Sequence, residues 1–237
     1  EAIMLNKNSE RKIKHINQDL FFSPPQYKAL EYLFKNNRVV LSAPTSFGKT
    51  LLIKEYIYLK QPKHVVYIVP TNALAYELEK SFKENEKFNN YTIFDKCKSV
   101  EDYNSVLLEN KKLFFIGTQE KFLEIDKTLF GKIDLFVIDE AYKLHESVKY
   151  QRAYKLSETF LDSVSDSSEK VFLLTPKANF TGFEKYNFAF YESTFNAVEK
   201  NYIVLRNEDF FETLLKKGTR EKTILFCSNP GQINHSY

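Results

Sequence analysis

The sequence has few of the residues that stabilise small secreted or metal-bound folds. It contains no tryptophan, one methionine and two cysteines among its 237 residues. Cys97 and Cys227 lie far apart and fit no zinc-binding spacing, so neither a disulfide scaffold nor a cysteine-rich metal site is expected. No apolar run approaches the ~18 residues of a membrane span, and residues 1–20 are too polar for a signal peptide. These absences favour a cytoplasmic protein that has no membrane partner.

Excess charge of one sign and glycine are also scarce. With 34 basic and 31 acidic residues, the formal net charge is +3, which is too small to identify a nucleic-acid binder by charge alone. The six glycines are about a third of the usual ~7%, so a glycine inside a phosphate-loop pattern carries more weight. In contrast, 22 phenylalanines and 15 tyrosines can build a packed core. At ~100–200 residues per domain, the length predicts one large domain, or one domain with part of a second.

Short β-branched or aromatic runs alternate with longer segments of helical period. The expected strands are Arg38–Ser42, His64–Val69, Tyr91–Phe94, Lys112–Ile116, Asp134–Ile138 and Lys170–Leu174. The expected helices run from about Gly48 to Lys60, from Asn72 to about Glu84, from near Gln119, and from about Tyr142 to Asp162. This alternation predicts an α/β fold with a mostly parallel sheet and helices on both faces. Ser163–Glu169 is expected to be an exposed loop, and residues 177–200 follow no clear pattern.

A phosphate-loop pattern stands between the first expected strand and its helix. Ala43–Thr50 matches G-x-x-x-x-G-K-[ST], except that Ala43 replaces the first glycine. The N–H groups of residues 46–50 would wrap a phosphate at a helix N-terminus, and Gly48 would allow a close backbone approach. Lys49 would reach the β- and γ-phosphates and Thr50 would ligate Mg²⁺. The expected contacts to ATP from this loop come from Thr45, Ser46, Phe47, Gly48, Lys49 and Thr50.

Two adjacent carboxylates follow the fifth expected strand. Asp139, at the carboxyl end of that strand, would hold Mg²⁺, and Glu140 would orient or deprotonate the attacking water. Open α/β folds bind ligands at this edge of the sheet. An Asp-Glu pair after a strand is by itself more typical of helix capping. The phosphate loop upstream favours the catalytic interpretation.

The two patterns together resemble motifs I and II of superfamily 2 helicases, the DEAD/DExH-box group. Other segments resemble further motifs of that family in the expected order, namely Val69–Leu74 (Ia), Gly117–Lys121 (Ib), Leu173–Pro176 (III) and Ile224–Ser228 (IV). The similarity covers about residues 21–230. The residue sequence of the phosphate loop is more similar to that of DExH-type processive helicases and bacterial defence-associated helicases than to that of DEAD-box proteins. The resemblance implies a RecA-like P-loop domain with ATP and Mg²⁺ as cofactors.

The resemblance also implies a base-binding site and a nucleic-acid site. Gln26 lies 23 positions before Lys49 and resembles the glutamine of a Q-like motif, whose amide suits the adenine edge. Phe21 or Phe22 is placed to stack on the base, and Phe22 is the candidate. The residues implied to hold the backbone of one single-stranded or partly duplex DNA or RNA strand are Pro70, Thr71, Asn72, Gly117, Thr118 and Lys121. Thr71 and Asn72 also fit simple helix capping, which is compatible with phosphate binding.

Three departures from the family pattern bear on function. Tyr142 occupies the fourth position of the D-E-x-D/H box, and motif III reads Thr175-Pro176 instead of S-A-T. Both put the coupling of hydrolysis to unwinding in doubt. Motifs V and VI are missing from the sequence, and motif VI supplies the arginine fingers that stabilise the transition state.

The sequence thus predicts the N-terminal motor domain of an ATP-dependent helicase or translocase, an ATP hydrolase that is weak or inactive as this fragment. Residues 1–20 would form a basic lead-in, residues 21–200 the first RecA-like domain, and residues 201–237 a linker and the start of a second such domain. The segments Tyr202–Leu205, Glu208–Lys217 and Thr223–Cys227 are expected to be a strand, a helix and a strand of that last part. Two alternatives remain open: a non-unwinding module that binds ATP and nucleic acid, and the translocase part of a restriction or defence system.

Overall fold

The computed structural model describes residues 22–94, 112–125, 130–145, 151–165, 168–176 and 183–195. All of them belong to the first of two units into which the chain divides, Glu1–Val198 and Glu199–Tyr237. The predictions for residues 1–20 and for the segments after residue 200 lie outside the described residues.

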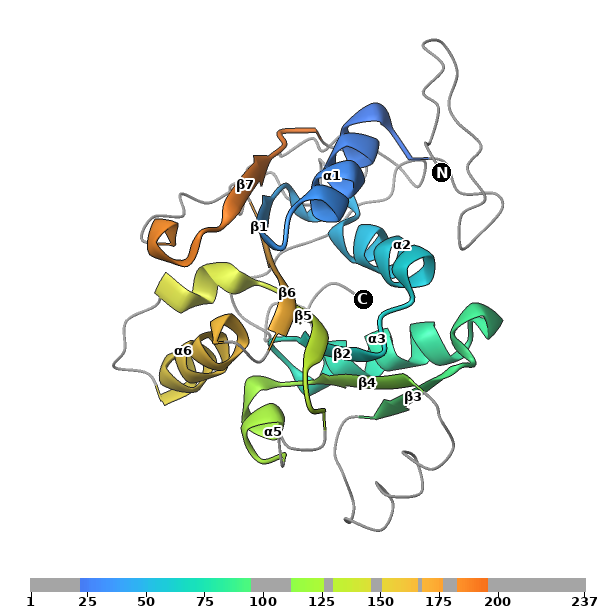
Figure 1. Cartoon of the computed structure of the whole chain (residues 1–237), viewed down its shortest axis with the longest axis vertical. Coiled ribbons are helices and arrows are strands. Elements are labelled where there is room, and N and C mark those ends of the chain that lie inside the picture. Colours follow the sequence, from blue (N-terminus) through green and yellow to red (C-terminus); the bar gives the residue numbers. More distant parts are fainter. Residues whose placement is uncertain are drawn as a thin grey trace, which may run out of the picture. The chain divides into compact units, whose positions relative to one another are not determined.

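The described part of the first unit contains a seven-stranded sheet in which every strand pair is parallel (Figure 1). The strands are β1 (Arg38–Ser42), β2 (His64–Ile68), β3 (Tyr91–Phe94), β4 (Lys112–Gly117), β5 (Ile133–Ile138), β6 (Ser168–Thr175) and β7 (Ala189–Glu192). Their order across the sheet is β3-β4-β2-β5-β6-β1-β7. The predicted α/β class and parallel sheet are confirmed, because apolar, β-branched strands of this kind are stable only when both faces are covered.

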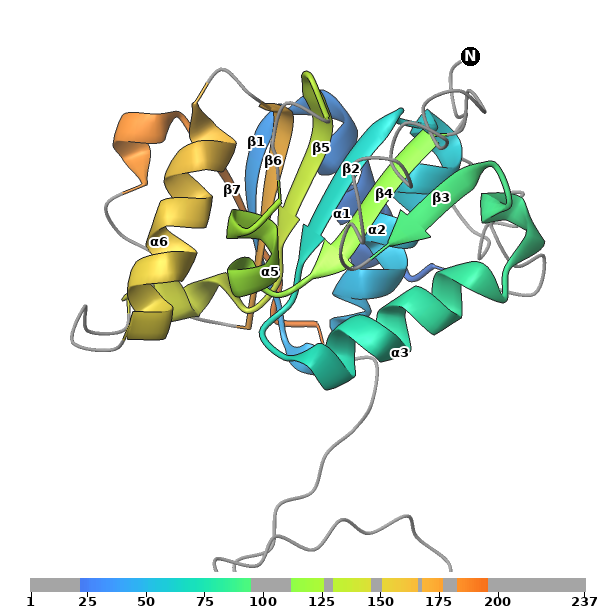
Figure 2. The same cartoon turned by 90° about the horizontal axis from the view of Figure 1, so that it is seen from below.

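Helices cover both faces of this sheet (Figure 2). They are α1 (Pro24–Lys35), α2 (Lys49–Lys60), α3 (Asn72–Lys83), α5 (Gln119–Leu123) and α6 (Gln151–Val164), with short 3-10 turns η1 (Thr45–Phe47), η2 (Glu86–Phe88), η4 (Ala141–His145) and η5 (Glu184–Tyr186). Successive strand residues feed two separate cores: Val39 and Leu41 pack on the side of α1, α2 and α3, whereas Val40 packs on the side of α5 and α6. This alternation fixes which side chains of each strand approach the phosphate-loop side of the sheet.

Helix α1 was not predicted from the sequence, although its start carries clear signals. Pro24 and Pro25 occupy the first helical positions, and the Ser23 N–H donates to Oε1 of Gln26 over 2.8 Å. The buried residues of the helix are spaced three and four apart, so that one face packs into the core: Gln26, Ala29, Leu30 and Leu33.

The predicted long helix from Tyr142 to Asp162 is wrong in two places. The chain forms the 3-10 turn Ala141–His145 before α6 begins at Gln151, and α6 continues to Val164. Ser163, predicted to be in an exposed loop, is fully buried and donates from Oγ to the Phe160 carbonyl over 2.7 Å. A serine that bonds to the preceding turn is satisfied inside a helix, so its polarity does not mark a loop here.

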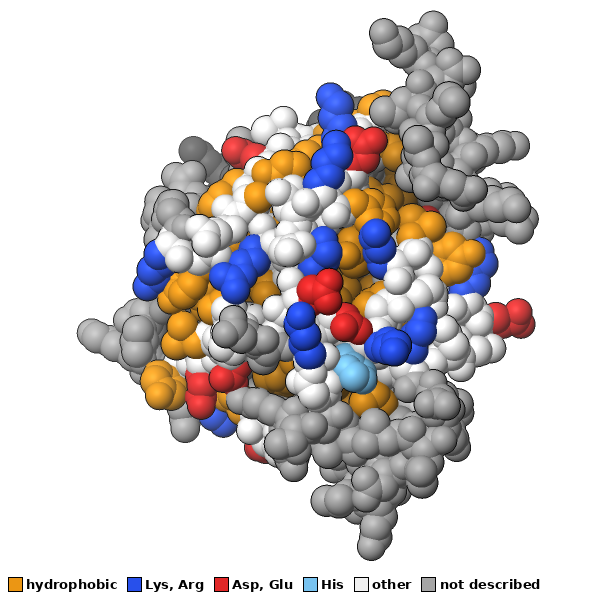
Figure 3. Space-filling view, in the orientation of Figure 1, with side chains coloured by type: hydrophobic (Ala, Val, Ile, Leu, Met, Phe, Trp, Pro, Cys, Tyr) orange, Lys and Arg blue, Asp and Glu red, His pale blue; other side chains and the backbone are white. Residues whose placement is uncertain are grey.

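The edge strand β7 was also missed: the aromatic run at 188–191 lies in a stretch that follows no clear pattern, and the strand residues alternate between half-buried and exposed. On the face seen in Figure 3, lysine and arginine side chains lie among acidic ones, so one sign of charge does not dominate there. Among the described residues, no helix has both the length and the apolar character needed to cross a membrane.

Candidate nucleotide and nucleic-acid site

The loops that carry the predicted site leave the sheet at its carboxyl edge. Backbone hydrogen bonds continue the sheet ladder past the strand ends: Ala43 donates to Thr175 (3.1 Å) and Asp139 to Ile68 (2.9 Å). A third such bond joins Val69 to the Gly117 carbonyl over 2.9 Å. Because the order of strands is β4-β2-β5-β6-β1, the phosphate loop lies at one end of this edge and the motif Ia and Ib segments at the other. Asp139 lies between them.

The phosphate loop is a single 3-10 turn that ends in a left-handed residue. Gly48 has φ 83° and ψ 33° and is the N-cap of α2. A Cβ atom at this position would lie 3.1 Å from Nε2 of Gln26, so both the backbone conformation and the space favour glycine. Thr45 is exposed and Ser46 is half-buried. Phe47 is fully buried and contacts the Phe195 ring edge-on, so this residue offers a ligand its backbone and not its side chain.

Lys49 folds back over the loop that precedes it. Its Nζ donates to the carbonyls of Ala43 (2.7 Å) and Pro44 (3.1 Å), and the residue is only 8% exposed. Burial lowers the pKa of Lys49, while the negative charges of Asp139 and Glu140 raise it in part. The lysine therefore lies within the electrostatic reach of both carboxylates.

The chain turns sharply after β5 at Glu140. This residue has a left-handed φ of 50°, and its N–H donates to Oδ1 of Asp139 over 2.8 Å. Burial raises the pKa of Asp139, although that hydrogen bond and the charge of Lys49 oppose the shift. One carboxylate oxygen of Glu140 lies 2.5 Å from Nζ of Lys143. Asp139 and Glu140 are thus both half-buried, and Glu140 is paired with Lys143.

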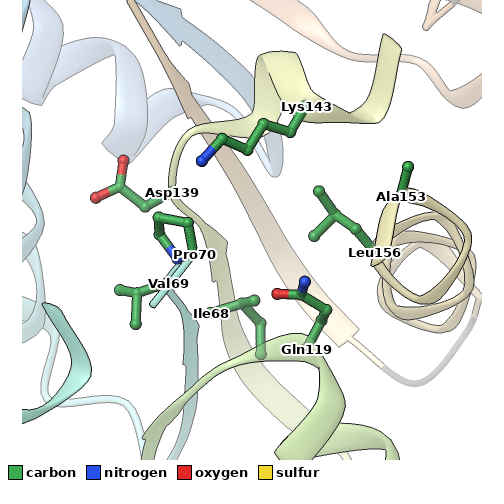
Figure 4. A pocket seen from close by; sticks show the side chains of 8 residues that line it. All are labelled: Ile68, Val69, Pro70, Gln119, Asp139, Lys143, Ala153 and Leu156. Carbon is green, nitrogen blue, oxygen red and sulfur yellow. The ribbon is translucent and has the colours of Figure 1, made fainter. Parts of the chain in front are cut away.

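A cavity of about 120 Å³ lies beside Asp139 on the side of α5 and α6 (Figure 4). Its walls are Ile68, Val69, Pro70, Gln119, Asp139, Lys143, Ala153 and Leu156. In Figure 4 the Lys143 amine extends toward Asp139, and the charge of Lys143 lowers the pKa of that carboxyl. The sequence analysis missed Lys143, although its place one turn after the Asp-Glu pair is a usable signal. Tyr142, in the fourth position of the box, is half-buried beside the α6-side core.

Gln26 lies against the phosphate loop, as expected for a base-reading residue, but its amide already has protein partners. Nε2 donates to the Phe47 carbonyl (2.8 Å), and Oε1 accepts from the Ser23 N–H and hydroxyl. Phe22 is 3% exposed and packs edge-on to Tyr27. A base that stacks on Phe22 must first displace what covers that ring, so its stacking role stays a prediction.

The predicted nucleic-acid residues differ in how accessible they are. Thr71 and Asn72 are exposed at the N-terminus of α3, where Thr71 Oγ1 accepts from Leu74 N–H over 3.2 Å. Pro70 and Gly117 are buried, and Thr118 is 4% exposed. Lys121 is half-buried on α5. A ligand that approaches this edge therefore meets the α3 terminus first.

The residues predicted for Mg²⁺ form a suitable but incomplete ligand set. Thr50 and Asp139 supply a hydroxyl and a carboxylate, the hard oxygen donors that Mg²⁺ prefers. The described residues contain no group of three His, Cys, Asp or Glu side chains placed for a metal. This matches a metal that is held by one or two protein oxygens together with substrate phosphates. The residues present thus fit the cofactor that the motifs imply.

An all-parallel sheet with a phosphate loop after β1 and an Asp-Glu pair after β5 defines a RecA-like nucleotide-binding domain. The chain belongs to the DEAD/DEAH box helicase family, whose model matches residues 23–176. The resemblance to superfamily 2 helicases that the motifs predicted is therefore confirmed.

Relatives agree with this assignment. The chain is 28% identical over 227 residues to "Anti-bacteriophage protein B" of Escherichia coli (strain K12), covering 88% of this chain and 30% of that protein. It is 32% identical over 142 residues to "ATP-dependent DNA helicase Hel308" of Methanocaldococcus jannaschii, covering 53% of this chain and 11% of that protein. The fold matches the crystal structure of a DEAD box protein from the hyperthermophile Methanococcus jannaschii, with a TM-score of 0.55 and 17% identity, over 84% of this chain and 58% of that one. The chain thus spans less than a third of the length of these curated relatives.

Proposed function

We propose that the chain is the N-terminal motor domain of an ATP-dependent nucleic-acid helicase or translocase, with the RecA-like domain over residues 21–200. The observation that carries the proposal is the convergence of Lys49, Asp139 and Glu140 at the carboxyl edge of the sheet, where both acidic charges act on the lysine. A buried cation and two half-buried carboxylates beside a helix N-terminus suit the binding of a metal-nucleotide anion.

Each residue of the proposed nucleotide site has a distinct task. The N–H groups at the start of α2 bind phosphate oxygens, and Lys49 moves from the loop carbonyls to the β- and γ-phosphates. Thr50 and Asp139 hold Mg²⁺, which when bound neutralises charge on the phosphate oxygens. Glu140 orients the attacking water, and its partly exposed side chain gives it access to that water. Gln26 and Phe22 bind the base.

The strand-binding residues lie at the other end of the same edge. Thr71 and Asn72 are exposed at the N-terminus of α3, where the helix dipole and the first N–H groups attract a phosphate. Pro70, Gly117, Thr118 and Lys121 complete the predicted contact set. Such contacts position a strand without reading its sequence, which agrees with a small net charge.

In helicases of this family, ATP hydrolysis needs groups from a second RecA-like domain. We therefore infer that these 237 residues bind ATP but hydrolyse it slowly. The corresponding experiment uses the longer protein that contains this domain. Nucleic-acid-stimulated ATP hydrolysis is compared for the wild type, Lys49→Ala and Lys60→Ala, the last an exposed lysine at the far end of the same helix. Loss with Lys49→Ala alone supports the proposal, and equal activity in all three rejects the phosphate-loop assignment. Strand displacement would then separate a helicase from a module that does not unwind.

One observation favours a second, more specific role in defence against bacteriophages. The similarity to the anti-bacteriophage protein extends over 88% of this chain, well beyond the phosphate loop and the Asp-Glu pair. We propose that the motor acts in such a system, and phage plaque counts in cells that express the wild type or Lys49→Ala test it. Protection by both proteins alike would contradict a role that depends on ATP.

A further inference from the structure

Tyr67 places a polar atom in the core on the phosphate-loop side of the sheet. The residue lies in β2, is fully buried, and packs in the core beneath α1, α2 and α3. Its hydroxyl has no hydrogen-bond partner among the described residues. Buried polar groups almost always have a partner, so an orphaned phenol oxygen in this place calls for a physical explanation.

Thr50 is a neighbour of this hydroxyl and the charge of Asp139 reaches it, and these are the two residues proposed to hold Mg²⁺. The Thr50 hydroxyl lies beside it and lowers the pKa of Tyr67, although the geometry falls short of a hydrogen bond. The negative charge of Asp139 acts in the opposite direction and raises that pKa, as burial does to a greater extent. The phenol oxygen therefore lies near the N-terminus of α2 and within the field of the carboxylate after β5.

A tyrosine hydroxyl differs from the other orphaned hydroxyls of the described residues, which belong to Ser42, Thr159 and Ser168. A serine or threonine oxygen can rotate about χ1 toward a nearby backbone carbonyl. The oxygen of Tyr67 is held at the end of a packed ring, so it can contact only the groups beyond the ring along its axis. The groups identified in front of it belong to the proposed metal site.

We propose that Tyr67 is a positioning residue for the Mg²⁺ site. When the metal-nucleotide is bound, the Tyr67 oxygen accepts the hydrogen of the Thr50 hydroxyl and turns its own hydrogen toward Asp139. The lone pairs of Thr50 then face the metal, and the carboxylate is oriented from behind. This inference rests on the proposed nucleotide site and assigns to it a residue outside its motifs. Removal of a group that hydrogen-bonds to a metal ligand and orients it typically changes metal affinity by about 10–100-fold.

The test uses Tyr67→Phe in the full chain, because phenylalanine keeps the ring and removes only the hydroxyl. Binding of a fluorescent ADP analogue is measured as a function of Mg²⁺ concentration and again in EDTA. We expect the Mg²⁺ concentration that gives half of the maximal increase in nucleotide affinity to rise about tenfold. The nucleotide affinity in EDTA should be unchanged. Without nucleotide, we expect the melting temperature not to fall, because the hydroxyl removed has no partner.

Tyr91→Phe is the matched control. Tyr91 is also a buried tyrosine, but its hydroxyl donates to the Pro62 carbonyl over 2.8 Å at the opposite edge of the sheet. This variant should lower the melting temperature and leave the Mg²⁺ dependence unchanged. In Thr50→Val, adding Tyr67→Phe should cause a smaller further loss than it does in the wild type, because only the contact with Asp139 is left to remove.

The outcomes separate the two proposals. Wild-type Mg²⁺ dependence in Tyr67→Phe, an equal loss of affinity with and without Mg²⁺, or fully additive losses with Thr50→Val would each overturn the role of Tyr67. In all three cases the wild type still binds the metal-nucleotide, so the proposed function stands. A wild-type chain that shows no Mg²⁺-dependent nucleotide binding overturns both.

Discussion

The side-chain amide of Gln26 connects α1 to the phosphate loop by donating from Nε2 to the carbonyl of Phe47 over 2.8 Å. At the same time its Oε1 accepts from the N–H of Ser23 over 2.8 Å, so both ends of a buried amide are engaged within the protein. A base that binds Gln26 must replace at least one of these bonds. The Ser23 N–H, the Phe47 carbonyl and a bound base therefore compete for the same Gln26 amide.

Replacing Gln26 by alanine should affect both stability and base preference. The change leaves the Phe47 carbonyl and the Ser23 N–H without their partner, so the free energy of unfolding should fall by about 1–3 kcal/mol. Preference for ATP over GTP should also be lost. Asn36→Ala serves as the control, because it removes a side-chain hydrogen bond from Nδ2 to the Tyr32 carbonyl at the other end of α1. Urea unfolding and competition binding measure both effects. An unchanged preference in Gln26→Ala would refute base reading by Gln26.

Gly48 and Gly131 allow the backbone and space requirements of the phosphate loop to be separated. Both have a left-handed φ, 83° and 56°, but a Cβ atom meets Gln26 at Gly48 and nothing within 4 Å at Gly131. Gly131→Ala should cost about 1–2 kcal/mol from the backbone alone and leave nucleotide binding intact. Gly48→Ala should cost more and abolish binding, because the loop must move. If Gly48→Ala and Gly131→Ala change urea unfolding and nucleotide binding equally, the contact of the new Cβ atom with Gln26 has no effect on either.

Asp139 should reduce the stability of the fold at neutral pH, because burial raises its pKa above the ordinary value of 3.8. A carboxyl with a raised pKa in the folded state contributes most below its unfolded pKa, and that contribution is lost as pH rises through the folded pKa. Asp139→Asn should therefore melt higher than the wild type at pH 7. The difference should shrink as the pH falls toward 3.8. Melting curves from pH 4 to pH 7 test this direction, and a gap that widens toward low pH would contradict it.

Much of the fold could be predicted from the sequence because its strands are buried on both faces. Arg38–Ser42 has an apolar centre, Tyr91–Phe94 consists of aromatic and β-branched residues, and the structure forms β1 and β3 with those bounds. The half-exposed strand β7 was missed although residues 188–191 form an aromatic run. Likewise, the chain turns at Glu140 through a left-handed conformation before it reaches α6. A positive φ is uncommon for glutamate, so the sequence does not predict this turn.

The candidate site was predictable to the extent that its chemistry follows local spacing. Gly48 and Lys49 are separated from their strand by a fixed loop length, so their place at the helix N-terminus could be inferred. Tyr67 was not identified, because its relation to Thr50 depends on how α2 packs over β2 and not on distance along the chain. The burial of Phe22 has the same origin, since contact with Tyr27 and the rest of the core decides it.

Asn72 offers a test of strand binding in which stability and affinity should change in opposite directions. The residue is exposed in the first turn of α3, so Asn72→Asp should stabilise the helix by about 0.3–1 kcal/mol through its dipole. The same new charge should repel a nucleic-acid phosphate and weaken binding of a single-stranded oligonucleotide. The deficit should shrink between 0.1 M and 1 M salt, because the screening length falls from about 10 Å to about 3 Å. Asn89→Asp makes the same charge change at an exposed position before β3, at the opposite edge of the sheet, and should leave oligonucleotide affinity unchanged. If both variants lose affinity equally, net charge and not the α3 terminus governs binding. If neither does, the strand lies elsewhere.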